Sequence, residues 1–332
     1  MKNFVFKGTE SECAPGVKPS QGCRMAQSNF FAVLSNAHCR GFSLVELMIV
    51  VVIFFFVVGA VLDIYISQHH ASVTQAQVSD TQQNARIAMD FLSKEIRMAG
   101  FGMPTGGVTI GGTTFSDAID PVNNDSVGGN NVLDGTDEIT IITGYRQISA
   151  LANSAVAGAT QITLNAAADK FNTTTRRYVC IDGIGAVDVY EVTGIIGNTL
   201  TVTPSLNRSY VQEAPVMLVK AITYSVNDAG VLTRDENTGG GAQPLVPHIE
   251  DLQFAYQVDG DTTWYDTPGT LSGIRAVRIN VLARTRAQDR QPGESGTIGR
   301  RPDIEDHDVD NVIDGFRRRL LTSVVKVRNL GL

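Results

Sequence analysis

Glu46 is the side chain that most clearly demands a chemical role. It lies at the start of the apolar run Leu47–Leu62, and no other charged residue follows until Asp63. A charged side chain inside a membrane costs roughly 2.5–3.5 kcal/mol, so a carboxylate retained in such a run is a candidate functional group. If the run is a helix, its N-terminal dipole also favours a carboxylate at this position.

Two other charged clusters could bind ligands. In the segment 303–310, Asp306, Asp308 and Asp310 alternate and could offer oxygens to calcium. The segment lacks the glycine and the terminal glutamate of an EF-hand loop, so we interpret it as a solvated acidic loop, with calcium as the alternative. The three cations Arg317–Arg319 are expected to flank a strand and balance this loop, with a DNA contact as the alternative.

Residue types that serve catalysis are scattered along the chain. Beyond residue 41 the histidines are His69, His70, His248 and His307, and there is no nucleophile elbow, no metal-spaced His/Cys set and no nucleotide loop. We therefore predict no enzyme activity, no catalytic residue, no metal site and no cofactor.

The composition narrows the class of protein. The chain has 332 residues, of which 43% are hydrophobic and 18% charged, with 32 glycines and a formal net charge of −7. These values favour a β-rich globular part, and the acidic excess disfavours general binding to nucleic acid. Three of the four cysteines precede residue 40, while Cys180 lies in the apolar stretch Tyr178–Ile181. We expect a buried thiol there and no disulfide framework.

The element that must position Glu46 is a membrane-spanning helix over Phe42–Ile66. About 25 residues can cross a hydrocarbon layer of ~30 Å, and a lone segment in lipid must satisfy its own backbone as a helix. The run is longer than the core of a secretory signal peptide and ends at no small-residue cleavage site. Basic residues precede it and acidic residues follow, which predicts a cytoplasmic N-terminus and a body outside the cytoplasm.

From Asp63 onward the pattern becomes amphipathic. Apolar residues recur at helical spacing from Ala85 to Ala99, and Gly100 and Pro104 then end the pattern. We predict one helix that runs to about Met98, with a length of roughly 80 Å. Its first half is apolar all round, and its second half has one apolar face on which a domain can pack.

The body is predicted to be an antiparallel β-domain, which gives an α+β fold with a long N-terminal helix packed on a sheet. Gly106 to Gly135 has little periodicity and is interpreted as an exposed loop. Short alternating segments then follow, with a hairpin turn at Gly197-Asn198. The predicted strands are Glu138–Thr143, Gln161–Leu164, Arg177–Ile181, Asp188–Thr193, Thr199–Thr203, Val216–Val226, Val231–Arg234, Leu252–Val258, Ile274–Arg284 and Leu320–Arg328.

The segment Gly41–Leu47 resembles the N-terminal processing signal of type IV prepilins and type II secretion pseudopilins. The resemblance implies that a membrane aspartyl peptidase cuts between Gly41 and Phe42 and then methylates the amine of Phe42. It also implies that Glu46 is needed for assembly, and we expect it to neutralise the Phe42 amine of a neighbouring subunit. The implied partners are other minor and major pilins, the prepilin peptidase/methyltransferase and the inner-membrane assembly platform.

Two further segments, Lys94–Gly102 and the C-terminal pattern from Leu252 to Asn329, resemble PilW-type minor pilins. This narrows the family to the large minor pilins and leaves about residues 105–245 unspecified. The sequence departs from the family in its 41-residue leader, for which Met25 is an alternative start, and in having no proline between Phe42 and Met103.

The sequence and its resemblances together predict four parts: a prepilin leader (1–41), a transmembrane half-helix (42–66), an amphipathic half-helix (67–103) and a β-rich pilin domain (104–332). We expect a minor type IV pilin that primes or caps the pilus, stored in the bacterial inner membrane as a single-pass protein. A pseudopilin resembling the J subunit of type II secretion is one alternative. A membrane-anchored module that binds DNA or a surface ligand is the other.

Overall fold

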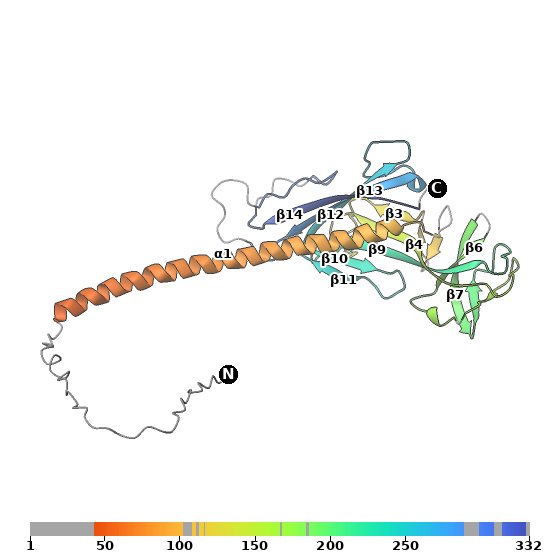
Figure 1. The fold of residues 1–332 in the computed structure, drawn as a ribbon. Coiled ribbons are helices and arrows are strands. Elements are labelled where there is room, and N and C mark those ends of the chain that lie inside the picture. The colour runs from red at the N-terminus through yellow and green to blue at the C-terminus, as the bar shows by residue number, and fades with distance from the viewer. Residues whose placement is uncertain are drawn as a thin grey trace, which may run out of the picture. The chain divides into compact units, whose positions relative to one another are not determined.

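The computed structural model of this chain divides into two units, one ending at Ile64 and the other spanning Tyr65–Leu332. Helix α1 (Leu44–Met98) begins in the first unit and ends in the second (Figure 1). The structure describes residues 43–101, 108–110, 113–115, 117–166, 168–183, 186–288, 299–308 and 314–329.

In the first unit, the described part of α1 is apolar on every side. Side chains around its whole circumference are exposed, from Leu44 and Ile49 to Phe55 and Val61. Since α1 contains a stretch long and apolar enough to cross a membrane, an apolar surface of this kind suits lipid rather than water.

In the second unit, α1 buries a single face. Ala85, Ala88, Leu92 and Ile96 are almost fully buried and recur every three or four residues, as the amphipathic pattern predicted. The helix ends at Met98, also as predicted, because Gly100 adopts a left-handed φ of 77°. The amide of Gly100 then donates to the carbonyl oxygen of Ile142 at 3.0 Å, which ties the helix end to the sheet.

The body contains a large antiparallel sheet of nine strands. Strand β9 lies at its centre, with β4 along one edge and β10 and β6 along successive stretches of the other. The outer strands follow in the order β6-β7-β8-β5 on one side, while β10 pairs with β11 and β4 with β3. The strands are β3 (Ile119–Val122), β4 (Glu138–Ala150), β5 (Gln161–Thr163), β6 (Tyr178–Gly183), β7 (Ala186–Ile196), β8 (Thr199–Thr203), β9 (Pro215–Val226), β10 (Val231–Asp235) and β11 (Gln243–Pro247).

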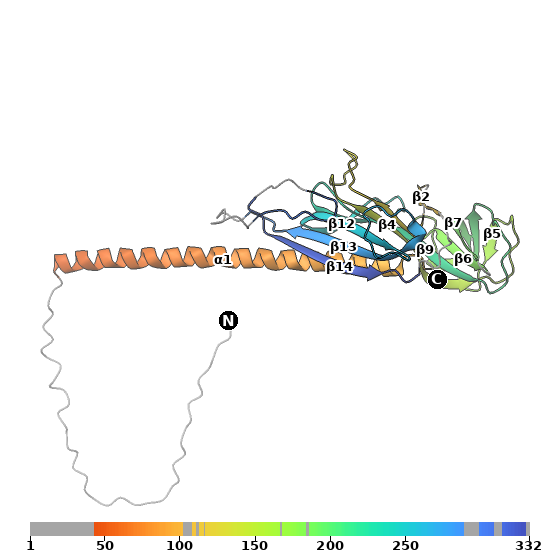
Figure 2. The same ribbon diagram turned by 90° about the horizontal axis from the view of Figure 1, so that it is seen from above.

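A separate antiparallel sheet has the order β12-β13-β14, formed by β12 (Ile249–Val258), β13 (Ile274–Arg284) and β14 (Arg318–Lys326). Its strands run beside the second-unit part of α1 (Figure 2). Val277, Ile279 and Val281 of β13 pack against the helix, and Arg278 and Asn280 lie on the opposite face, so the predicted alternation is confirmed.

The helix and both sheets share one hydrophobic core. Leu92 and Ile96 of α1 pack in a cluster with Tyr224 of β9, Phe254 of β12 and Ile279 of β13. A second cluster lies in the outer strands of the nine-stranded sheet and contains Leu200 and Tyr210. The predicted α+β fold, with a long helix packed on antiparallel sheet, is therefore confirmed.

Three expectations about the body were wrong. The segment Gly106–Gly135 is not all loop, because it contains the hairpin β1 (Val108–Ile110) and β2 (Thr113–Phe115) as well as β3. Strand β11 was missed because it carries two prolines, which ordinarily argue against a strand. The helix also packs on two sheets rather than one.

Candidate functional site

The predicted processing site is only partly within the described residues. Gly41 and Phe42 lie outside them, and Ser43 is the first residue that the structure describes. Glu46 lies in the first turn of α1 and is exposed, and the amide of Leu47 donates to the carbonyl oxygen of Ser43 at 3.1 Å. The helix therefore starts at Leu44, two residues before Glu46.

This position gives Glu46 a specific chemistry. The unpaired N–H groups of the first helical turn carry a partial positive charge that favours a carboxylate. The surrounding side chains are apolar. If a cation were brought into these apolar surroundings, the carboxylate would accept hydrogen bonds from it, because an unpaired charge there is strongly unfavourable.

The second-unit part of α1 is fixed to the body by polar contacts as well as by its apolar face. Lys220 of β9 forms an ion pair with Glu95 at 3.0 Å. The side-chain amide of Asn84 donates to the carbonyl oxygen of Pro247, and that of Asn329 donates to the carbonyl oxygen of Ala99. These contacts hold the body on the helix from the nine-stranded sheet and from the segment that follows β14.

The acidic segment is not simply a solvated loop, so that interpretation was wrong for two of its residues. Glu305 forms a two-point ion pair with Arg278 and also accepts a hydrogen bond from Asn280. The ring of His307 lies 3.0 Å from the buried carboxylate of Asp251. The segment is thus docked on the outer face of the three-stranded sheet.

The residues considered for calcium do not converge. Asp306 accepts a hydrogen bond from Asn123, Asp308 is exposed, and Asp310 lies outside the described residues. Within the described part of the chain, no group of three His, Cys, Asp or Glu side chains is placed to hold a metal ion. His69 of α1 stacks on Tyr65, with their ring centres 6.3 Å apart.

Asp137 is a buried carboxyl group that the sequence analysis missed. Its two oxygens accept hydrogen bonds from the amides of Asn124 and Phe254, at 2.9 and 2.7 Å. Burial is the main cause that raises its pKa to about 7, and nearby Asp306 and Asp251 add to the effect. In the sequence, the only sign of this buried carboxyl group is an aspartate that lies directly before an apolar strand.

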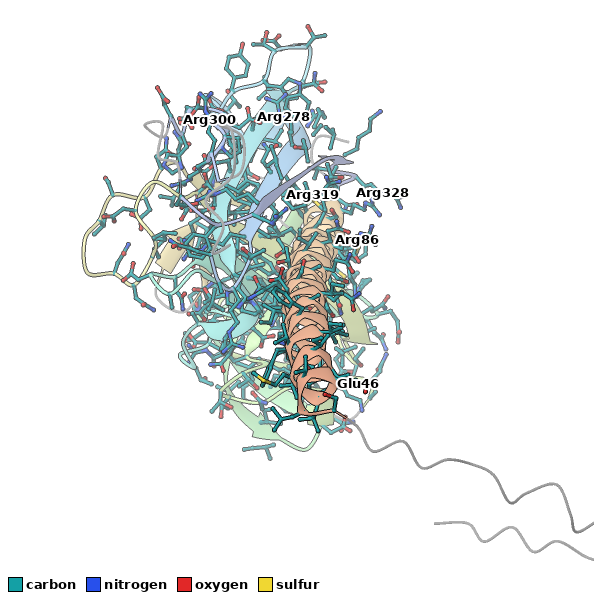
Figure 3. All side chains as sticks on the ribbon, turned by 90° about the vertical axis from the view of Figure 1, so that its left-hand side faces the viewer. Glu46, Arg86, Arg278, Arg300, Arg319 and Arg328 are labelled. Carbon is teal, nitrogen blue, oxygen red and sulfur yellow. The ribbon has the colours of Figure 1, made fainter. Side chains whose placement is uncertain are left out.

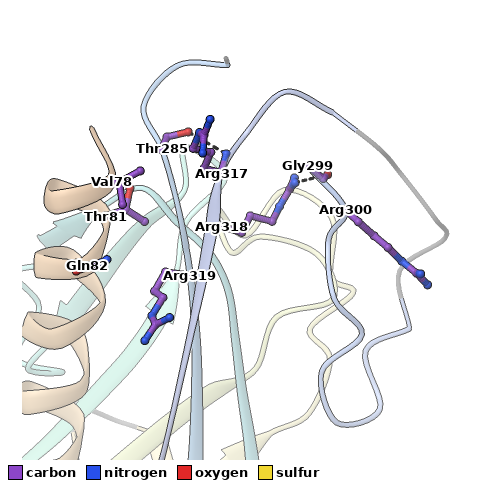
Figure 4. Close-up of a pocket in the computed structure, with 9 residues that line it drawn as sticks. All are labelled: Val78, Thr81, Gln82, Thr285, Gly299, Arg300, Arg317, Arg318 and Arg319. Carbon is purple, nitrogen blue, oxygen red and sulfur yellow. Dashed lines mark hydrogen bonds between the residues drawn. The ribbon is translucent and has the colours of Figure 1, made fainter. Parts of the chain in front are cut away.

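The three adjacent arginines have different environments (Figure 4). Arg318 is nearly buried and binds both Glu250 and Asp314, which raise the pKa of its guanidinium. Arg319 is exposed and lies toward α1, where it lines a pocket of about 350 Å³ with Thr81 and Gln82. The ion-pair partners of Arg318 lie outside the acidic segment 303–310, so these pairs do not provide the balance that was expected for that segment.

Cys180 is buried in β6, as the sequence predicted. Burial raises the pKa of its thiol to about 12, with Asp182 and Asp188 contributing. A thiol in this state is not a nucleophile at neutral pH.

Two family models match the chain. The prokaryotic N-terminal methylation motif matches residues 36–62, which include Gly41, Phe42 and Glu46. The type IV pilus-assembly protein W family, PilW, matches residues 195–329, which span β8 to β14. An apolar helix that begins within a methylation motif fits anchoring in a membrane and incorporation into a pilus.

Comparison with individual proteins is less informative. No curated protein matches the chain significantly. Among solved structures, a type IV-like pilin from Thermus thermophilus is similar, with 14% identity and a TM-score of 0.37, over 75% of this chain and 98% of that pilin.

The two family matches lie at opposite ends of the chain and describe different properties. One describes an N-terminus of the kind that is methylated, and the other describes most of the body that packs on α1. Together they support the identification of this chain as a type IV minor pilin of the PilW type.

Proposed function

We propose that this protein is a structural subunit that enters a pilus through α1 after cleavage between Gly41 and Phe42. The observation that carries the proposal is Glu46, a lone carboxylate in the first turn of an apolar helix, within the segment that matches the methylation motif. Cleavage creates an α-amine at Phe42, and methylation of that amine preserves its positive charge.

The proposed partner of Glu46 is the amine of Phe42 in a neighbouring subunit. A carboxylate buried among apolar helices without a cation would be strongly destabilising, whereas a paired one is tolerated. The amine of Phe42 does not exist before cleavage. The charge pair with Glu46 that directs assembly can therefore form only after processing. Glu46 is then an assembly residue rather than a catalytic one.

We assign four parts to the chain on this basis. Residues 1–41 are the leader, 42–66 the transmembrane half of the helix, 67–103 its amphipathic half and 104–332 the pilin domain. The subunit waits in the inner membrane as a single-pass protein with its body outside the cytoplasm. Its partners are other minor and major pilins, the prepilin peptidase/methyltransferase and the assembly platform.

We further propose that the subunit primes or caps the pilus instead of repeating along it. The support is the size of its body, which carries a nine-stranded and a three-stranded sheet on one helix. A body of this size is harder to repeat in a closely packed helical array than a smaller domain. The role requires assembly and no catalytic step.

The test is the substitution Glu46→Gln, which keeps the shape of the side chain and removes its charge. We expect normal membrane insertion and cleavage, and at least tenfold less of the protein in sheared pili. Asp63→Asn is the matched control, because Asp63 is the next acidic residue along the same helix and should not affect incorporation. Incorporation of Glu46→Gln at the wild-type level would refute the proposed pairing.

A further inference from the structure

Most described sheet edges in this protein are protected against pairing with another strand. At one end of the nine-stranded sheet, β11 is five residues long and carries Pro244 and Pro247. At the other end, β5 has only three residues. Short edge strands and prolines are two standard ways to prevent unwanted strand addition.

The free edge of β12 is covered by the protein itself. Asp137 donates its amide to the carbonyl oxygen of Leu252 and accepts from the amide of Phe254 through its carboxylate. Tyr256 exchanges two backbone hydrogen bonds with Tyr265, at 2.8 and 2.9 Å. The outward polar groups in the middle of β12 are therefore satisfied.

The edge of β14 is different, because β13 is the only described strand that pairs with it. The amide of Val327 donates to the carbonyl oxygen of Arg275, and the amide of Thr285 donates to that of Arg317. Since hydrogen-bonded pairs alternate in an antiparallel ladder, the odd-numbered residues of β14 bond to β13. The N–H and C=O groups of its even-numbered residues, Leu320, Thr322 and Val324 among them, point to the open edge.

The centre of this edge has none of the usual protective features. Strand β14 is nine residues long, and its stretch Leu320–Val325 contains no charge and no proline. Leu320 and Val324 are 37% and 52% exposed, and they share the outer face of the sheet with Thr322, which bonds to Asn280. An added strand would find both open backbone groups and apolar side chains here.

The ends of the same edge are basic. Arg319 is exposed on the helix side of the sheet and has no ion-pair partner among the described residues. Lys326 and Arg328 lie near the other end of the strand, on the outer face that also carries Leu320 and Val324. Figure 3 shows Arg319, Arg328 and Arg86 of α1 on one side of the molecule. In a chain of net charge −7, this local excess of cations selects for an acidic partner.

We propose that β14 accepts an extended segment of another subunit as an added strand. The segment alternates acidic side chains, which face Arg319 and α1, with apolar side chains, which pack on Leu320 and Val324. The inference rests on the proposed function, because it names the surface through which the body of the pilin contacts its neighbour. Nucleic acid is the less favoured partner, since it would leave the edge amides and the apolar side chains unused.

The test measures binding of a labelled peptide that alternates valine and glutamate to the full chain in detergent micelles. Fluorescence anisotropy should show saturable binding that weakens with salt, and the amides of Leu320, Thr322 and Val324 should become protected from hydrogen exchange. A peptide that alternates valine and lysine should not bind. A valine–glutamate peptide N-methylated at alternate residues should bind at least about tenfold more weakly, because it cannot complete the ladder.

Two variants and one control variant locate the site on the protein. Val324→Pro removes one outward donor and should weaken binding by about tenfold, whereas Val324→Thr keeps the donor and should bind normally. Arg319→Glu should also weaken binding by about tenfold, by charge repulsion. The N-methylated peptide gives the same information without altering the protein, so misfolding of a variant cannot hide the answer.

The proposal is overturned if the N-methylated peptide binds as well as the unmodified one, or if no binding occurs. It is also overturned if a short single-stranded oligonucleotide binds in an Arg319-dependent manner and the peptide does not. Each of these results leaves the processing site and the Glu46 test untouched, so failure of this inference is distinguishable from failure of the proposed function.

Discussion

The pKa of Asp137 couples the stability of the body to pH. Its carboxyl group has an ordinary pKa of 3.8, which burial raises to about 7 in the folded protein. The folded state therefore favours the protonated form. The resulting stabilisation is fully present below pH 3.8 and is lost as the pH rises through about 7.

We expect this group to lower the free energy of unfolding by on the order of 2–4 kcal/mol between pH 4 and pH 8. Asp137→Asn should be less stable at pH 4, because its amide faces two backbone donors, but it should lack this pH dependence. Urea unfolding followed by the fluorescence of Trp264, the single tryptophan, measures both effects. Asp261→Asn is the control, since the pKa of Asp261 is about 2 and its titration lies below this range. If the unfolding free energy of Asp137→Asn changed with pH as steeply as that of the wild type, the assignment of this pH dependence to Asp137 would be contradicted.

Arg318 and Arg319 provide a matched pair of substitutions. Arg318→Ala removes the cation that Glu250 and Asp314 share, but leaves Arg284 at 3.6 Å as an ion-pair partner of Glu250, and should destabilise the body by about 1–3 kcal/mol. Arg319→Ala removes an exposed side chain and should change stability by no more than about 0.5 kcal/mol. The same urea titration compares them, and equal effects would show that the ion pairs do not stabilise the fold.

At the scale of single residues, the local sequence marks some candidate residues and not others. Glu46 was identified because a charge in an apolar run is anomalous in the sequence itself. Asp137 and Glu305 were not, because their environments depend on Phe254 and Arg278, which are far away in the chain. The burial of a polar group is a property of the tertiary structure and leaves little trace in the neighbouring residues.

Helix α1 performs two tasks along its length. The part in the first unit is apolar all round, and the part in the second unit packs one face into the core. Leu92 lies in that core and is fully buried, while its neighbour Phe91 is 40% exposed. These adjacent residues separate the two faces of the helix.

Leu92→Ala should destabilise the body by about 2–5 kcal/mol, because it leaves a cavity between the helix and both sheets. Phe91→Ala should cost about 1 kcal/mol or less, since the side chain already contacts solvent. Thermal unfolding of the two variants in the same detergent measures the difference. Comparable losses would mean that the helix is not packed as described.

Among the elements, those with clear periodicity were predictable. The end of α1 and the strands β8 and β13 match the sequence interpretation closely, because they combine a regular apolar pattern with clear turn signals at Gly100 and Gly197-Asn198. β11 and the β1–β2 hairpin were missed because prolines and glycines mask their pairing. The separation of β12–β14 from the nine-stranded sheet could not be predicted either, since it depends on which strands pair over long sequence distances.

The whole molecule combines a long helix, apolar in its first unit, with a body in which β13 is the only described strand that pairs with β14. We propose that Glu46 of the helix supplies a charge-pairing group and that β14 offers a second contact surface. Both proposed surfaces would serve association with other subunits. Family membership was evident from the two ends of the sequence, whereas the open edge became visible only in the fold.

The proposed cleavage between Gly41 and Phe42 is tested most directly by the mass of the N-terminal peptide of the mature protein, isolated from cells that contain the prepilin peptidase. We predict a peptide that begins at Phe42 and carries one additional methyl group on its amine. The same peptide from cells without the peptidase should retain the leader through Gly41. A mature chain that begins at any residue other than Phe42 would contradict the account.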